Sequence, residues 1–112
     1  MAVEGFRRKL TAILSADVVG YSRLMDDNEE ATVRTLNIYR DSMKALIQQH
    51  RGRVVDATGD NLLAEFTSVV DALNCSAKIQ HELAERNTDL SPERRMEFRI
   101  GVNVGDVIEE ED

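Results

Sequence analysis

The sequence predicts an α+β domain with a ferredoxin-like βαββαβ order, in which two helices cover one face of the sheet. Runs of apolar and β-branched residues mark four strands, and two long segments with helical periodicity separate them. A turn sequence between the two central runs marks a hairpin. In this topology we expect the first strand and the strand that follows the hairpin to lie in the interior of the sheet.

The composition is typical of one compact domain. Of the 112 residues, 42% are hydrophobic and 31% are charged, as in ordinary globular domains. We predict a folded region at 9–108 between flexible ends at 1–8 and 109–112, the second of them acidic. The only cysteine, Cys75, cannot form a disulfide within the chain and is expected to be a small buried hydrophobe.

Charge and hydropathy argue against two kinds of partner. The net charge of -7 disfavours sequence-independent binding to nucleic acid, which needs a basic surface. An acidic protein that binds nucleotides needs divalent cations beside the phosphates. No apolar run approaches the ~20 residues of a membrane span, and the stretch MAVEGFRRKL lacks the apolar region of a signal peptide. We therefore expect a cytoplasmic chain without membrane insertion.

The first strand is expected within LTAILSADVV, residues 10–19, because this apolar run is short and ends before a glycine. Near its end it carries a carboxylate, Asp17. Val19, Gly20 and Tyr21 then lead from the strand into a helix, and the glycine lets the backbone approach a ligand closely. The amides of these three residues are candidates for binding phosphate oxygens.

Two long helices follow from capping signals and periodicity. The first is predicted to begin at Asp27, which forms a capping-box pattern with Glu30, and to stop at Gly52. Its apolar residues recur at helical spacing along one face. The second is predicted to be capped by Ser68 and to continue to Asn87.

The remaining strands are a central hairpin and a C-terminal strand. The runs RVVDA (53–57) and NLLAEF (61–66) flank a turn that carries a second carboxylate, Asp60. In the stretch MEFRIGVNVGDVI (96–108), apolar and other residues alternate, which predicts a strand with one buried face. Arg99 and Asn103 share the opposite face of this strand. We expect them to be solvated, and the alternative is that they line the open side of the sheet.

Asp17 and Asp60 can converge if the first strand and the hairpin are neighbours. Two close carboxylates at an apolar strand end are stable only when they are protonated or bound to metal. Oxygen ligands of this kind suit Mg²⁺, which typically takes one or two carboxylates together with substrate phosphates. Each aspartate taken singly is also compatible with an ordinary turn residue.

Four motifs in order carry a family resemblance: SADVVGYSRL, RVVDATGDNLLAEF, VVDALNCSAKIQ and FRIGVNVGDVI. Together they resemble the catalytic domain of class III adenylyl and guanylyl cyclases, most closely the bacterial soluble members. The resemblance implies that Asp17, Asp60 and the backbone carbonyl of Val18 bind two Mg²⁺ or Mn²⁺ ions. It also implies conversion of ATP or GTP into a 3′,5′-cyclic nucleotide and pyrophosphate.

The choice between ATP and GTP stays open. Four positions before Asp60, adenylyl cyclases of this family usually carry a lysine that reads adenine, and guanylyl cyclases a glutamate that reads guanine; here the residue is Asp56. A carboxylate can accept hydrogen bonds from the N1–H and the exocyclic amine of guanine, although aspartate is shorter than glutamate. Alternatively, Asp56 is a solvated acid at a strand end, paired with Arg53.

The resemblance also implies that catalysis needs a segment beyond the last strand, with an arginine that stabilises the transition state. Such an arginine is worth a factor of roughly 10³ or more in phosphoryl transfer. The 112 residues do not contain this segment, so we expect a truncated class III cyclase domain that is inactive by itself. Because class III cyclases work as head-to-tail dimers, a homodimer is expected.

Two other functions stay open on the sequence. A catalytically silent, cyclase-like dimerisation or regulatory module would tolerate both Asp56 and the missing segment. A different ferredoxin-like nucleotide enzyme, such as a diguanylate cyclase, would need a GGDEF-like hairpin, whereas the turn here has the sequence TGDN.

Overall fold

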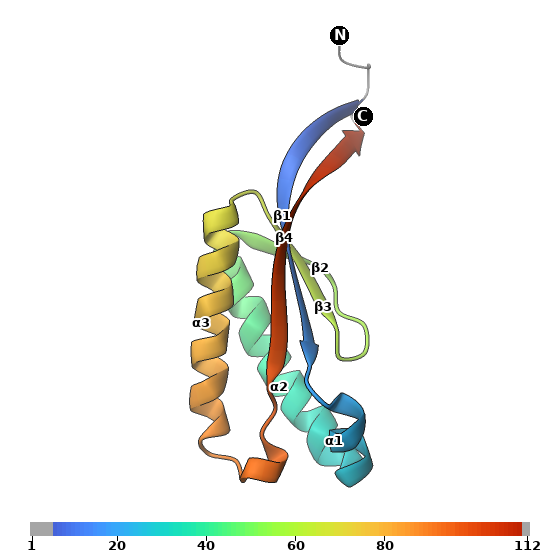
Figure 1. Cartoon of the computed structure of the whole chain (residues 1–112), viewed down its shortest axis with the longest axis vertical. Coiled ribbons are helices and arrows are strands. Elements are labelled where there is room, and N and C mark those ends of the chain that lie inside the picture. The colour runs from blue at the N-terminus through green and yellow to red at the C-terminus, as the bar shows by residue number, and fades with distance from the viewer. Residues whose placement is uncertain (1–5, 111–112) are drawn as a thin grey trace.

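The structure, a computed structural model, describes the backbone of residues 6–110. It is an α+β fold in which helices pack on one face of a four-stranded antiparallel sheet (Figure 1). The elements in order are β1 (Phe6–Val18), α1 (Tyr21–Asp27), α2 (Glu29–Gln49), β2 (Gly52–Asp56), β3 (Leu62–Phe66), α3 (Val69–Asn87), the 3₁₀ turn η1 (Pro92–Arg94) and β4 (Phe98–Glu110). The predicted order is confirmed, and the short helix α1 is an addition to it.

The sheet order β2-β3-β1-β4 places β1 in the interior, as predicted. The expectation that the strand after the hairpin is also interior was wrong, because β4 lies at an edge and β3 pairs with β1 on its other side. β1 and β4 pair along 13 residues each, whereas β2 and β3 have only 5 residues each. The β1–β4 ribbon consequently extends beyond the helices (Figure 1). It reaches into the segments predicted as flexible ends, because Phe6–Arg8 and Glu109–Glu110 belong to strands. Residues 1–5 and 111–112 lie outside the described part of the chain.

The core lies between the helices and one face of the sheet. Alternate residues of β1 and β3 point into it, and all are buried: Ala12, Leu14, Ala16, Val18, Leu62, Ala64 and Phe66. Cys75 on α3 is fully buried as predicted, and burial raises the pKa of its thiol to about 11. Val104 belongs to the predicted buried face of β4 but is 52% exposed, because the ribbon has passed the helices at that point.

The ends of α2 differ from the prediction. Asp27 is the last residue of α1, and Asn28 caps α2 instead, with its side chain accepting a hydrogen bond from a backbone amide of the first turn. Beyond the other end, Arg51 rather than Gly52 has the left-handed conformation, with φ 65°. Gly52 already belongs to β2, where a Cβ atom would overlap the Phe66 ring.

The other predicted elements are confirmed. β2 and β3 form the hairpin, and residues 57–61 join them. The Ser68 side chain accepts a hydrogen bond from the amide of Asp71, and α3 continues to Asn87. Among residues 6–110, no helix has both the length and the apolar character needed to cross a bilayer.

Candidate functional site

A cleft of about 530 Å³ lies on the side of the sheet opposite to the helices. It is formed where the end of β1 meets the beginning of β4 and the β2–β3 hairpin. Leu63 and Gly101 contribute apolar surface, and Asp17, Asp56 and Arg99 contribute charge. Since Asp17, Leu63, Arg99 and Gly101 alternate with core-facing residues along their strands, folding of the core also fixes this part of the cleft.

Asp17 is held by an arginine across the β1–β4 ladder. Arg99 lies directly opposite Asp17 in the register. Its Nε donates to Asp17 Oδ1 at 3.0 Å, and a terminal nitrogen donates to Oδ2 at 3.4 Å. The pKa of the Arg99 guanidinium is raised, mainly by its hydrogen bond to Asp17 and by the negative charge of Asp17. The charge of Asp60 raises it further by a smaller amount. The Arg99 side chain is exposed to solvent, as expected, and it also lines the cleft on the open side of the sheet, where it pairs with Asp17.

Asp60 reaches the same strand end from the hairpin loop. Its Oδ2 accepts a hydrogen bond of 3.1 Å from the backbone amide of Val18, the residue after Asp17. Gly59 before it has φ 60°, a left-handed turn conformation that favours glycine. The structure thus brings the Asp60 carboxylate to the backbone of the residue after Asp17, and the charges of both acids raise the pKa of Arg99.

The donor set at this strand end fits a hard cation. It offers the carboxylates of Asp17 and Asp60 and the backbone carbonyl of Val18, all of them oxygen donors. Within residues 6–110, no group of three or more His, Cys, Asp or Glu side chains is arranged to hold a metal ion. A cation here would therefore take its remaining ligands from water or from a bound phosphate, as Mg²⁺ commonly does.

The turn after β1 fits a phosphate only in part. The Val19 amide donates to the Glu97 carbonyl at 2.8 Å, so the expectation that it is available for a phosphate oxygen does not hold in this structure. Gly20 is left-handed, with φ 66° and ψ 36°, and it precedes Tyr21, the first residue of α1. The Arg23 guanidinium folds back over this turn, since a Cβ on Gly20 would lie 3.3 Å from it. Sequence reasoning did not identify this cation.

A β-bulge in β2 determines where Asp56 points. Val54 pairs with Ala64, which is buried in the core, and simple alternation would place Asp56 on the same face. The register shifts at Val55, so Asp56 instead pairs with Leu63, which lines the cleft. The bulge therefore brings the carboxylate of Asp56 to the cleft side of the sheet.

Asp56 has a different partner from the one expected. Its Oδ1 accepts a hydrogen bond of 2.8 Å from the Thr58 hydroxyl. The alternative pairing with Arg53 was wrong, because Arg53 binds Glu65 on the neighbouring strand. Asp56 is consequently exposed in the cleft without a basic partner among the contacts of the described residues.

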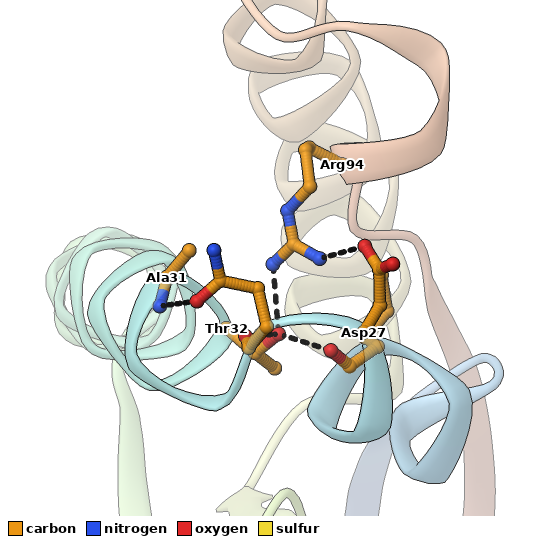
Figure 2. Close-up of polar contacts among 6 residues, drawn as sticks. Asp27, Ala31, Thr32 and Arg94 are labelled. Atoms are coloured by element: carbon orange, nitrogen blue, oxygen red, sulfur yellow. Dashed lines mark hydrogen bonds and ion pairs between the residues drawn. The ribbon is translucent and has the colours of Figure 1, made fainter.

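A second arginine, Arg94, fixes the helix α1. The first turn of α1 follows the end of β1 that lines the cleft. Arg94 donates to Asp27 Oδ2 at 3.1 Å and to the hydroxyl of Thr32 at 2.8 Å (Figure 2). The fully buried hydroxyl of Thr32 also lies 2.8 Å from the Leu24 carbonyl and 2.7 Å from the Asn28 carbonyl. We refer to these five residues as the Arg94 cluster. It anchors the end of α1, as the hydrogen bond between Val19 and Glu97 anchors its beginning.

The family of the chain follows from its sequence match. The family described as "Adenylate and Guanylate cyclase catalytic domain" matches residues 6–112. The chain belongs to this family. Cyclase domains of this family use two metal ions and bind nucleotides, which agrees with the oxygen donors described above.

Individual relatives of this cyclase domain agree with the assignment. It is 45% identical over 112 residues to "Putative adenylate cyclase 3" of Rhizobium meliloti (strain 1021). The crystal structure of an adenylate/guanylate cyclase/hydrolase from Silicibacter pomeroyi superimposes with a TM-score of 0.82 at 39% identity over 92% of the chain. The guanylyl cyclase Cya2 superimposes with a TM-score of 0.79 at 29% identity over 93% of the chain.

The cyclase domain described here is shorter than these relatives. It spans 19% of the Rhizobium protein, 60% of the Silicibacter structure and 58% of the Cya2 structure. The solved relatives confirm the α+β fold over nearly the whole chain.

Proposed function

We propose that this domain acts as a purine nucleotide cyclase, which converts ATP or GTP into a 3′,5′-cyclic nucleotide and pyrophosphate for intracellular signalling. The observation that carries the proposal is the hydrogen bond between Asp60 Oδ2 and the amide of Val18, next to Asp17. It gathers oxygen donors at one strand end beside an open cleft, which suits two-metal chemistry on a nucleoside triphosphate.

In this proposal the chain supplies positioning and charge. Asp17, Asp60 and the carbonyl of Val18 hold two Mg²⁺ or Mn²⁺ ions. When bound, these ions activate the ribose 3′-hydroxyl and neutralise the charge on the leaving pyrophosphate. The 3′-hydroxyl releases its proton to solvent as its oxygen forms a bond to the α-phosphorus. The bond from that phosphorus to the pyrophosphate oxygen breaks, and pyrophosphate leaves. The left-handed turn at Gly20 lets the backbone approach the phosphates closely.

The base lies beside Asp56 in this proposal. On the cleft side of the sheet, its carboxylate can accept hydrogen bonds from guanine, whereas a ring nitrogen of adenine would present a second acceptor to it. Substitution Asp56→Lys is expected to shift nucleotide preference towards adenine. Calorimetry with non-hydrolysable ATP and GTP analogues measures this preference directly.

The same calorimetry, with Mn²⁺ present, tests the proposed metal site. We expect Asp17→Asn and Asp60→Asn each to weaken nucleotide binding at least about tenfold, since each removes a charged ligand from a site with few protein ligands. Asp41→Asn is the matched control, because it removes one carboxylate from an exposed position on α2. A folded wild-type chain that gives no heat with either nucleotide contradicts the proposal.

A catalytically silent dimerisation or regulatory module is the second candidate. Asp56 favours it, because a carboxylate of this length is neither of the residues that usually read the base in this family. This candidate predicts self-association without nucleotide binding. Sedimentation velocity combined with the calorimetry separates the two, since the cyclase requires both a homodimer and metal-dependent nucleotide binding.

A further inference from the structure

The bond between Arg99 and Asp17 lies within the proposed metal site. Both oxygens of Asp17 face the guanidinium, at 3.0 and 3.4 Å. A divalent cation on the same carboxylate would lie close to this positive charge, and like charges at such distances repel each other. Arginine and cation are therefore alternative partners of Asp17.

Arg99 is a permanent neighbour of Asp17. The two residues are direct partners in the β1–β4 ladder, which fixes their Cβ atoms about 4.5–5.5 Å apart. Among the contacts of the described residues, Asp17 is the only hydrogen-bond partner of Arg99. The guanidinium is thus always within reach of the carboxylate, and no other contact holds it there.

The same pair is easily broken. The Arg99 side chain is 72% exposed and that of Asp17 is 39% exposed. Exposed ion pairs contribute little net free energy, because solvent screens the charges and long side chains lose entropy when they pair. A cation that interacts with Asp17 and Asp60 together can consequently displace the arginine.

We propose that Arg99 competes with a divalent cation for the carboxylate of Asp17. A cation that binds Asp17 breaks the ion pair, and Arg99 thereby sets the cation concentration at which the site fills. The inference rests on the proposed function, since it takes Asp17 to be a cation ligand. Arg99 is a positioning residue in this scheme. Without the cation it holds the carboxylate, and with the cation it lies free in the cleft.

The test is Mn²⁺ binding to the whole chain without nucleotide, measured by electron paramagnetic resonance of the free ion. We expect Arg99→Ala to bind Mn²⁺ about two- to fivefold more tightly than wild type, the size expected for loss of one exposed competing pair. Arg53→Ala is the matched control, because it breaks an exposed cross-strand pair with Glu65 and changes the net charge equally. It should leave Mn²⁺ affinity unchanged.

A second measurement follows Arg99 itself. The Nε–H signal of Arg99 in ¹⁵N NMR, identified by its loss in Arg99→Ala, is expected to shift when Mg²⁺ is added to wild type, and the shift should disappear in Asp17→Asn. Unchanged or weaker Mn²⁺ binding by Arg99→Ala, with wild type still binding, would overturn this inference alone. Absence of Mn²⁺ binding in both wild type and Arg99→Ala overturns the inference together with the proposed metal site.

Discussion

The Arg94 cluster and the Arg99–Asp17 pair use the same chemistry in opposite environments. Arg94 lies in η1 and Arg99 at the beginning of β4, and each binds an aspartate near the beginning of the chain. The Arg94 side chain is 19% exposed and contacts a fully buried hydroxyl, whereas that of Arg99 is 72% exposed in the cleft. Burial, rather than the presence of an ion pair, therefore separates a contact that stabilises the fold from one that a ligand can replace.

The largest expected effect on stability is that of Arg94→Ala. This substitution removes both hydrogen bonds that connect η1 to α1 and α2, and it leaves the buried hydroxyl of Thr32 without its donor. We expect the free energy of unfolding to fall by about 2 kcal/mol, measured by urea denaturation. Arg34→Ala, which breaks only the exposed helical pair with Glu30, should have almost no effect. Equal losses in both variants would contradict the comparison.

Thr32→Val tests the buried end of the same cluster. Valine keeps the shape of threonine but removes the hydroxyl that lies between Arg94 and the Leu24 carbonyl. The expected loss is about 1 kcal/mol in the free energy of unfolding. Urea denaturation of the double variant Thr32→Val/Arg94→Ala should show a smaller loss than the sum of the single variants, because the two residues share one hydrogen bond. Strict additivity would show that they act independently.

The smallest expected effect on stability is that of Arg99→Ala. Because its guanidinium contacts only an exposed carboxylate, the urea midpoint should stay within experimental error of wild type. Together with tighter Mn²⁺ binding, this result would sharpen the contrast with Arg94. A midpoint as low as that of Arg94→Ala would instead assign Arg99 to the support of the fold.

The features that depend on repeating patterns were predictable from the sequence. The short apolar run of β1, alternation along β4, helical periodicity in α2 and α3, and the cap at Ser68 together define the topology. That topology brings the hairpin loop to the end of β1, and so the approach of Asp60 to this strand end follows from the order of the elements alone.

The features that depend on single hydrogen bonds or on register were not predictable. Asp27 and Asn28 are consecutive residues that can both cap a helix, and only the path of α1 decides between them. The bulge at Val55 has no marker in the sequence. Arg99 was recognisable as a residue of the polar face, but its pairing with Asp17 requires the β1–β4 register, which tertiary packing sets.

The β-bulge in β2 makes position 56 a site that protein engineers can vary without disturbing the core. The course of the β2 backbone, and not packing of the residue itself, directs the side chain at position 56 away from the interior. A longer or oppositely charged residue at this position therefore contacts solvent rather than the core. Ligand preference and foldability can thus be altered separately at this point. A regular ladder, with Val55 opposite Leu63, would remove that independence, since it would turn the residue at position 56 towards the helices.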